Sequence, residues 1–507
     1  MIFIRFLWRH AVACFLFTFF RSTAGIPRLG NRALRPAGDI SPMEMIGLYP
    51  TWFEPGLGSG WIVGLIATIH VLFSHTSVGA AIFFAFLANY AHRHQRPDLL
   101  EFIRRYGLFL LVFSYVLGSI TGPGIWYSTT VASPRGISAL IHSFVWMWAT
   151  EWVFFVIEVV GVYMLVYLAN RLNARTHLKV SVIFGLTSYT TMLVIVGILS
   201  FMMWPGQAGW YETGGVLNAF YGPNTFAQLG MRSAFMFTMT AVVGGIVAAR
   251  FQDAAFKKDV ARKLAWLGIC SAVAGAAMFQ WYLNTLPETA ALVLANRLPA
   301  WFQPALLGIL GATVAYFAMT LLQPRNLVAG GAAAMTLAVL VFGLWPEEVA
   351  RESIRKPWVA GQYVYSNQVV GRDVPGMGVR SEIPTIEAHG FLKTMVFLPD
   401  HLRTITDSNR VEAGRVLALA TCSNCHSLSA TGMRPLRNYF SASNSTSEIA
   451  DYLQAALSTG NTLYMPQIPF KDDEALALAS FIATLNLPSA PAATQAKAQA
   501  ATSTIKE

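Results

Sequence analysis

Eight long apolar segments dominate this 507-residue chain and restrict it to a membrane-spanning helical fold. Each is long enough to cross a bilayer as a helix, for which about 20 apolar residues suffice. They lie near residues 61–89, 107–128, 137–169, 180–204, 226–249, 264–284, 303–322 and 327–345. Only 12% of the residues are charged, against about 25% in ordinary soluble domains. The predicted fold class is all-α, a polytopic bundle of about eight transmembrane helices over residues 45–346.

The distribution of basic residues predicts how these segments are oriented. The loops after the first, third, fifth and seventh segments hold most of them: Arg93, Arg96, Arg104, Arg105, Arg171, Arg175, Lys179, Arg250, Lys257, Lys258, Arg262, Lys263 and Arg325. The alternate loops hold Arg135 and Arg297, with Arg232 at the edge of the fifth segment. Basic loops stay in the cytoplasm, so both ends of the bundle are predicted to lie outside a bacterial inner membrane. The net charge of +10 follows largely from this topology and indicates no nucleic-acid partner.

A Cys-x-x-Cys-His motif near the C-terminus, Cys422 to His426, is typical of c-type haem attachment. Two thiols form thioether bonds to the haem vinyl groups, and the adjacent histidine binds the iron. The alternatives are a redox dithiol, which does not need the histidine, or half a zinc site. The chain has four cysteines and no second closely spaced pair for zinc. We therefore predict one covalent haem c, held by Cys422, Cys425 and His426.

The sixth iron ligand is predicted to be Met465, because Met/His ligation is usual in cytochromes c. Met465 precedes a final predicted helix, Asp472 to Leu487. Met433 is the alternative, but it lies close to the attachment motif, where little chain is available to wrap a haem. A class I cytochrome c domain is predicted over residues 408–488. It is expected on the periplasmic side, where haem c is attached and to which an even number of spans returns the chain.

The remaining segments are predicted from their composition. Residues 1–40 resemble a signal peptide in layout, although a mis-assigned start near Met43 or Met45 is the alternative. Residues 347–407 form a periplasmic connector without a spanning run. The tail, residues 489–507, is rich in Ala, Pro, Thr, Gln and Lys and is expected to be disordered.

Ionisable side chains inside membrane spans are costly and therefore mark candidate functional residues. The first segment carries His70 and His75, and the third carries His142, Glu151 and Glu158. The two glutamates share one helix face, about 10 Å apart along the axis. Imidazoles suit membrane haems and buried carboxyls suit a proton path. The alternative is that each histidine bonds a neighbouring helix and each glutamate pairs with a buried arginine. Three further histidines fall in predicted cytoplasmic loops, where we expect solvent contact: His92, His94 and His177.

Two separate stretches of this chain resemble subunit I of cytochrome bd oxidase. Residues Trp61 to Phe73, which include His70, followed by Gly118 to Gly122, are similar to the opening helices of that family. Residues Glu352 to Trp358 are similar to its Glu-x-Gly-Arg-Gln-Pro-Trp signature. The resemblance covers about residues 45–365. It implies two non-covalent haems, b and/or d.

The resemblance assigns roles residue by residue. It implies that His70 binds one high-spin haem iron and Glu352 the other. Arg355 would compensate haem propionate or carboxylate charge. Glu151 and Glu158 resemble the third-helix glutamates that deliver protons from the cytoplasm. A further family glutamate falls near His142.

The chain also departs from the family pattern. The family's low-spin haem b uses a histidine in the fifth helix, where this chain has Arg232 or Ser233. Its partner methionine is missing from residues 302–309, and the quinol-binding loop is reduced to about residues 285–302. We therefore expect neither the low-spin haem nor the usual quinol site, with the cytochrome c domain receiving electrons instead.

These features together predict a membrane-bound terminal reductase. Electrons from a periplasmic donor such as a soluble cytochrome c would reach haem c and then reduce O2 to water at the high-spin haem pair. The alternatives are reduction of nitric oxide or another small oxidant, or a non-catalytic electron-transfer subunit. The expected partners are membrane lipid and a second membrane subunit resembling subunit II of the family.

Overall fold

The computed structural model describes residues 51–52, 60–429, 432–460 and 464–486. Contacts divide the chain into two units, Met1–Ile46 and Gly47–Glu507. The leader expected over residues 1–40 and the tail expected over 489–507 lie outside the described residues.

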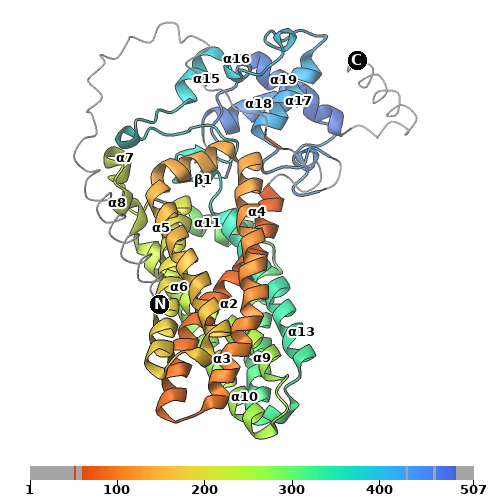
Figure 1. The fold of residues 1–507 in the computed structure, drawn as a ribbon. Helices are drawn as coiled ribbons and strands as arrows, with labels where there is room; N and C mark the ends of the chain where they lie inside the picture. Colours follow the sequence, from red (N-terminus) through yellow and green to blue (C-terminus); the bar gives the residue numbers. More distant parts are fainter. Residues whose placement is uncertain (1–50, 53–59, 430–431, 461–463, 487–507) are drawn as a thin grey trace, which may run out of the picture. The chain divides into compact units, whose positions relative to one another are not determined.

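Eight helices in the described part of the chain are long and apolar enough to cross a membrane, which confirms the predicted bundle (Figure 1). Three of the spans contain short irregular turns within them. In order they are α2 (Gly60–Arg93); α3 (Pro97–Leu110), η1 (Leu111–Val116) and α4 (Leu117–Ala132); α5 (Pro134–Tyr167), kinked at Phe144; α6 (Ala174–Met203); α9 (Pro223–Ala248); α10 (Ala254–Asn284); α12 (Phe302–Leu322); and α13 (Ala329–Val339), η4 (Leu340–Leu344) and α14 (Trp345–Ile354).

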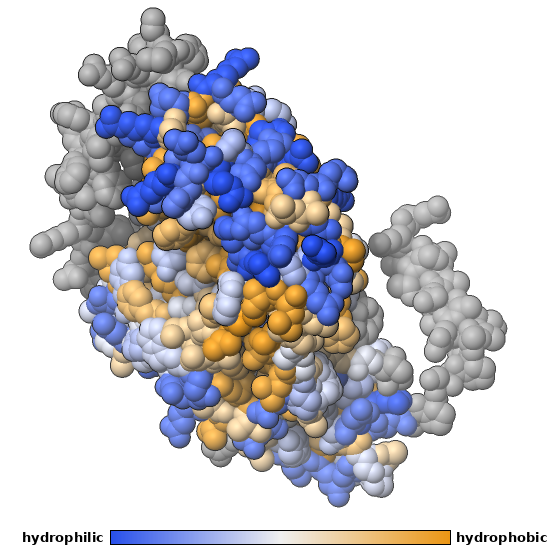
Figure 2. All heavy atoms as spheres, turned by 90° about the horizontal axis from the view of Figure 1, so that it is seen from below, coloured by the Kyte–Doolittle hydropathy of each residue, from blue (hydrophilic) through white to orange (hydrophobic). Residues whose placement is uncertain are grey.

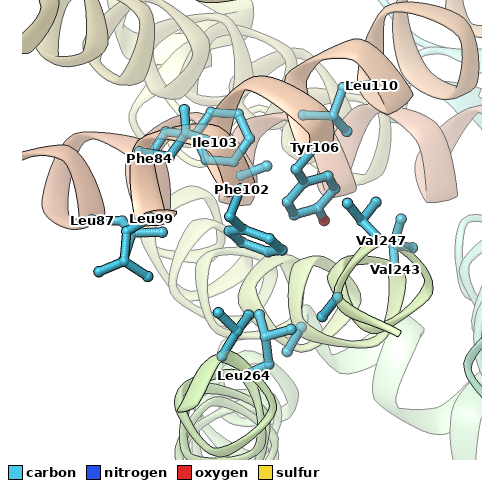
Figure 3. Close-up of a cluster of buried hydrophobic side chains, with 14 of the residues drawn as sticks. Phe84, Leu87, Leu99, Phe102, Ile103, Tyr106, Leu110, Val243, Val247 and Leu264 are labelled. Carbon is cyan, nitrogen blue, oxygen red and sulfur yellow. The ribbon is translucent and has the colours of Figure 1, made fainter. Parts of the chain in front are cut away.

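Helices α2 and α9 form the centre of the bundle. In the most apolar stretch of each helix, 67% of α2 and 83% of α9 is buried inside the protein, against 17% of α12. Small residues allow the close approach, as is usual between membrane helices: a Cβ atom on Gly79 of α2 would lie 2.6 Å from the Met236 carbonyl oxygen of α9. Figure 3 shows the adjoining core, where side chains from α2, α3, α9 and α10 meet. Tyr106 of α3 donates a hydrogen bond of 2.8 Å to the Thr240 carbonyl of α9 there.

The outward-facing surfaces of several spans are apolar. Val112, Ile120 and Tyr127 of the second span are exposed, as are Trp146 and Trp152 of α5. On the face seen in Figure 2, hydrophilic residues gather in patches and apolar residues are exposed between them. Exposed apolar side chains on spanning helices are what lipid or another membrane protein would cover.

Two expectations about helix ends differ from the structure. The last span was expected to end near residue 345, but α14 continues to Ile354. Its charged residues pair with one another three positions apart, which lets the helix extend beyond the apolar run. The expectation that His177 is solvated in a loop was wrong. The Asn173 side chain accepts the Thr176 N–H at 2.9 Å and starts α6 early, so that His177 is buried within it.

Short elements lie between α6 and α9, between α10 and α12, and in the connector that follows the last span. They are α7 (Trp210–Thr213), α8 (Val216–Phe220), α11 (Glu288–Arg297), β1 (Trp358–Ala360), β2 (Val364–Tyr365), η5 (Pro375–Met377), α15 (Ile383–His389), α16 (Phe391–Thr394) and η6 (Asp400–Leu402). Two further turns, η2 (Ala169–Arg171) and η3 (Pro324–Asn326), join α5 to α6 and α12 to α13. Strands β1 and β2 pair antiparallel. The connector is fixed to the bundle where α4 meets α5, because Gln368 accepts the Arg135 and Gly136 N–H groups at 3.0 and 3.2 Å.

The C-terminal region is helical and has its own apolar core. It contains α17 (Arg410–Thr421), η7 (Leu436–Tyr439), α18 (Thr446–Leu453), η8 (Gln454–Ser458) and α19 (Asp472–Leu485). Helices α17 and α19 cross so closely that a Cβ atom on Gly414 would lie 1.9 Å from the Ala477 carbonyl oxygen. Glu474 of α19 also accepts the Phe391 and Leu392 N–H groups at 2.9 and 2.7 Å. This contact joins the connector to the C-terminal core.

Candidate functional site

The Cys-x-x-Cys-His motif begins directly after α17, and its histidine is oriented by the loop that follows. The His426 N–H bonds the Cys422 carbonyl at 2.9 Å. The His426 Nδ1–H donates to the Arg434 carbonyl at 3.0 Å. Metal-binding histidines usually donate their second ring nitrogen in this way, which fixes the tautomer and leaves Nε2 for the metal. The arrangement fits an axial ligand of haem iron.

The environment of the thiols and methionines further supports a haem site over a redox dithiol. Cys422 and Met465 both pack against the apolar cluster built on α17 and α19, whereas Met433 is 43% exposed. This difference favours Met465 over Met433 as the sixth ligand. Burial raises the pKa of the Cys422 thiol to about 11. Redox-active dithiols instead need a lowered thiol pKa, because the thiolate is the reactive form.

His70 of α2 is held by the facing helix α4. Its Nδ1 lies 2.9 Å from the Thr121 Oγ1. The Thr121 hydroxyl itself donates to the Leu117 carbonyl at 2.9 Å, so the His70 Nδ1–H must be the donor to Thr121. A Cβ atom on Gly122 would lie 3.6 Å from the His70 Cε1. The Nε2 atom therefore carries the lone pair that an axial haem ligand needs.

His75, one and a half turns further along α2, has a different environment. Its Nε2 lies 3.2 Å from Nη1 of Arg232 in α9, and its Nδ1 lies 3.3 Å from the Ser74 hydroxyl. Arg232 is 5% exposed, and its Nη2 lies 3.8 Å from Glu347 of α14. Because Arg232 can only donate, its contact uses the His75 Nε2 lone pair. His75 is therefore a bonded core histidine, which is the alternative weighed from the sequence.

A cavity of about 690 Å³ adjoins His75 and Arg232. Its walls come from α2, α9, α10, α12 and the last span, and they are mainly apolar. The resemblance places the family's low-spin haem between the fifth and seventh spans, which here are α9 and α12. Among the described residues that line the cavity, His75 is the only histidine, and both its ring nitrogens are engaged. The cavity does not fit a haem with an imidazole ligand.

Helix α14 carries two ion pairs close to the Glu352–Trp358 segment. Arg351 donates to both carboxylate oxygens of Glu348 at 2.5 to 3.0 Å, and the two side chains are 10% and 4% exposed. Glu352 pairs with Arg355, and the Lys356 Nζ lies 3.6 Å from its second oxygen. Both Glu352 oxygens are thus engaged, and binding a metal would require this ion pair to open. The role of Glu352 as an iron ligand stays a prediction.

The third-span carboxyls are not paired with arginine. Thr191 of α6 donates to the buried Glu158 at 2.5 Å. Tyr115 of η1 also interacts with Glu158, and the Ser77 hydroxyl of α2 donates to Tyr115 at 2.9 Å. None of the ion pairs among the described residues includes Glu151 or Glu158. A chain of hydroxyls therefore links α6, α5, η1 and α2 through Glu158.

Glu151 and His142 are placed less distinctively. Glu151 is half-buried and lies about two helical turns before Glu158 on the same face of α5. His142 is exposed, and its Nδ1–H bonds the Ser138 carbonyl of its own helix at 2.8 Å. Their roles in proton transfer stay predictions. Within the described part of the chain, no three His, Cys, Asp or Glu side chains form a cluster that would hold a metal ion by themselves.

Several residues that build these sites were not found from the sequence. Thr121, Tyr115 and Thr191 are hydroxyl residues in apolar helices, where Thr usually bonds its own helix backbone and the partner of a Tyr hydroxyl depends on which helix packs beside it. Their partners lie 51, 43 and 33 positions away in the chain. Glu347, Glu348 and Arg351 gave a stronger signal, since three charges within five residues directly follow an apolar run.

Comparison with known proteins identifies the membrane fold. No protein-family model matches the chain, and no curated protein matches it. Among solved structures, the chain is similar to the bd oxidase from Geobacillus thermodenitrificans, with a TM-score of 0.52 and 15% sequence identity. The match covers 60% of this chain and 89% of that chain. The protein is therefore a multi-pass membrane protein whose helical bundle has a bd oxidase-type fold.

Proposed function

We propose that the protein is a membrane-bound, haem-dependent terminal reductase that receives single electrons outside the membrane and reduces O2 to water. The observation that carries this proposal is His70, held through Nδ1 by Thr121 inside a bd oxidase-type bundle, in a chain that also has a c-type haem motif. The overall reaction takes four electrons and four protons per O2 and releases two waters.

Two sites on the chain would hold haem. Cys422, Cys425, His426 and Met465 would hold one covalent haem c at the C-terminal region. His70 would bind one of two non-covalent haems in the bundle, with Glu352 predicted to bind the other. When bound, haem supplies one-electron transfer and, where an axial position is open, binding of a small oxidant. The side chains around these sites orient the ligands and exclude water.

Protons would reach the reaction through the hydroxyl chain at Glu158. Thr191, Glu158, Tyr115 and Ser77 are hydrogen-bonded or adjacent across four helices. A carboxyl group between hydroxyls can accept a proton from one and donate it to the next. Glu151 would stand on the same helix face as the next proton acceptor.

The proposed arrangement includes partners outside this chain. A soluble cytochrome c or another one-electron donor would reduce the C-terminal site on the periplasmic side. A second membrane subunit would cover part of the apolar surface exposed on the second and third spans.

Replacing His70 with Ala is expected to remove one non-covalent, CO-reactive haem signal from the reduced protein. The change deletes the imidazole, while the Thr121 hydroxyl keeps its hydrogen bond to the Leu117 carbonyl within α4. His94→Ala, an exposed histidine beyond the span, is the matched control and should leave the spectrum unchanged. Reduced-minus-oxidised and CO-difference spectra of the purified protein make the measurement. An unaltered spectrum in His70→Ala would return His70 to a purely structural role. Only six-coordinate, CO-unreactive membrane haem in the parent protein would favour an electron-transfer subunit.

A further inference from the structure

The C-terminal core and the membrane bundle are joined by two aromatic side chains next to the candidate haem sites. The first is Trp358, which ends the Glu352–Trp358 segment. Its backbone N–H donates to the Arg355 carbonyl at 2.9 Å. Its ring stacks on Tyr365 with centroids 4.0 Å apart and planes inclined by 14°. Trp358 is therefore bonded on one side to the residue that pairs with Glu352.

On its other side, Trp358 belongs to the C-terminal core. Tyr365 is a buried member of the apolar cluster formed by α17 and α19, and Trp358 packs against that cluster. Cys422 and Met465, two residues of the covalent haem site, pack against the same cluster. The Trp358–Tyr365 stack thus belongs to the same apolar cluster as the haem c site and is also bonded to the Arg355 end of α14.

The second aromatic residue is Tyr464, the chain neighbour of Met465. It packs against a different apolar cluster at the ends of the spans, which contains Met203 of α6, Met231 of α9 and Ile354 of α14. Ile354 directly precedes Arg355, whose Nη1 lies 3.6 Å from the Met202 sulfur. Trp358 is thus bonded to Arg355, and Tyr464 shares an apolar cluster with Ile354, at the same end of α14.

We propose that Trp358 and Tyr464 carry electrons between the haem c site and the membrane bundle. The rate of electron tunnelling falls steeply as the gap between atoms widens. It is highest where the path runs through covalent bonds, hydrogen bonds and packed contacts. In each event one electron would pass from a haem held by Cys422, Cys425 and His426 to a non-covalent haem in the bundle, so no atom is transferred. The inference rests on the proposed function, because it presumes an acceptor near α14.

The test uses the full-length holoprotein, four single variants at Trp358 and Tyr464, the double variant Trp358→Leu/Tyr464→Leu and one control. Trp358→Leu and Tyr464→Leu remove the rings, while Trp358→Phe and Tyr464→Phe keep an aromatic ring. Tyr452→Leu is the matched control, because Tyr452 lies in the same region but is 51% exposed on α18. Each protein is reduced with ascorbate and a mediator and mixed rapidly with O2. The haem c absorbance band is then followed in time.

We expect oxidation of haem c to be about tenfold slower in Trp358→Leu and slower still in the double leucine variant. A tenfold slower rate corresponds to a barrier about 1.4 kcal/mol higher. The phenylalanine variants and Tyr452→Leu should react at the parent rate. The midpoint potential of haem c and the limited-proteolysis pattern of residues 395–410 should stay unchanged in all of them.

Two results would overturn the inference. Parent-like oxidation in the double leucine variant would show that electrons take another route. Slow oxidation accompanied by a shifted haem c potential or new proteolytic cleavage would show that the two residues only hold the regions together. If haem c of the parent protein is reduced but never reoxidised by O2, the proposed function itself fails, and this result is distinct from the other two.

Discussion

Replacing Cys422 and Cys425 together with Ala is expected to remove covalent haem from the protein and to leave non-covalent haem in the membrane bundle. Cys422 packs against the apolar cluster on α17 and α19, whereas His70 and Thr121 lie on α2 and α4 of the membrane bundle. Loss of the thioether bonds therefore has no direct effect on His70 and Thr121. The measurement is haem staining after denaturing electrophoresis, together with the total haem content of the purified protein.

The matched control for this variant is Cys270→Ala, which changes a cysteine of α10 outside the motif. It should keep the covalent haem stain in full. Loss of every haem from intact, membrane-inserted Cys422/Cys425 variant would contradict the existence of two independent sites. A covalent stain that persists without these thiols would contradict the attachment motif.

Replacing Glu348 with Ala is expected to lower the stability of the membrane bundle by about 3–5 kcal/mol, because the buried Arg351 guanidinium loses the carboxylate to which it is hydrogen-bonded. Both side chains are almost excluded from solvent, and Gly64 of α2 packs against the Glu348 side chain. The measurement is the thermal unfolding midpoint of the purified protein in one detergent.

Two further variants make this test specific. Replacing both Glu348 and Arg351 with Met removes both charges and should recover most of the loss. Glu101→Ala breaks an ion pair at the more exposed Arg104 and should cost no more than about 1 kcal/mol. A parent-like midpoint in Glu348→Ala, or a double variant as unstable as the single one, would show that the buried pair is not what holds α14.

The spans and the haem c motif were predictable because their signals are local in sequence. A run of about 20 apolar residues determines a spanning helix wherever it packs. The Cys422–His426 spacing is likewise a local signal, and the covalent haem that it indicates stays a prediction. The Met465 prediction used only its place before the last helix. Met465 packs against the C-terminal core and Met433 is exposed, and the role of Met465 as the sixth ligand stays a prediction.

The contacts that distinguish one buried residue from another were not predictable. His70 and His75 look alike in the sequence, yet one bonds Thr121 of α4 and the other Arg232 of α9. These partners are 51 and 157 residues away, and only the packing of helices selects them. His177 was misplaced for a related reason, since an Asn173 cap extended a helix beyond its apolar run. The polar α14 was missed as helix because its ion pairs, rather than its hydropathy, sustain it.

The most direct test of the central claim is oxygen uptake by the purified protein with two kinds of donor. Reduced cytochrome c, or ascorbate with a one-electron mediator, is compared with a quinol. We predict uptake with the one-electron donors that is lost in the Cys422/Cys425 variant, and no comparable uptake with quinol. Rapid uptake with quinol that does not depend on Cys422 and Cys425, or no uptake from a preparation with its haems intact, would contradict a terminal reductase supplied through haem c.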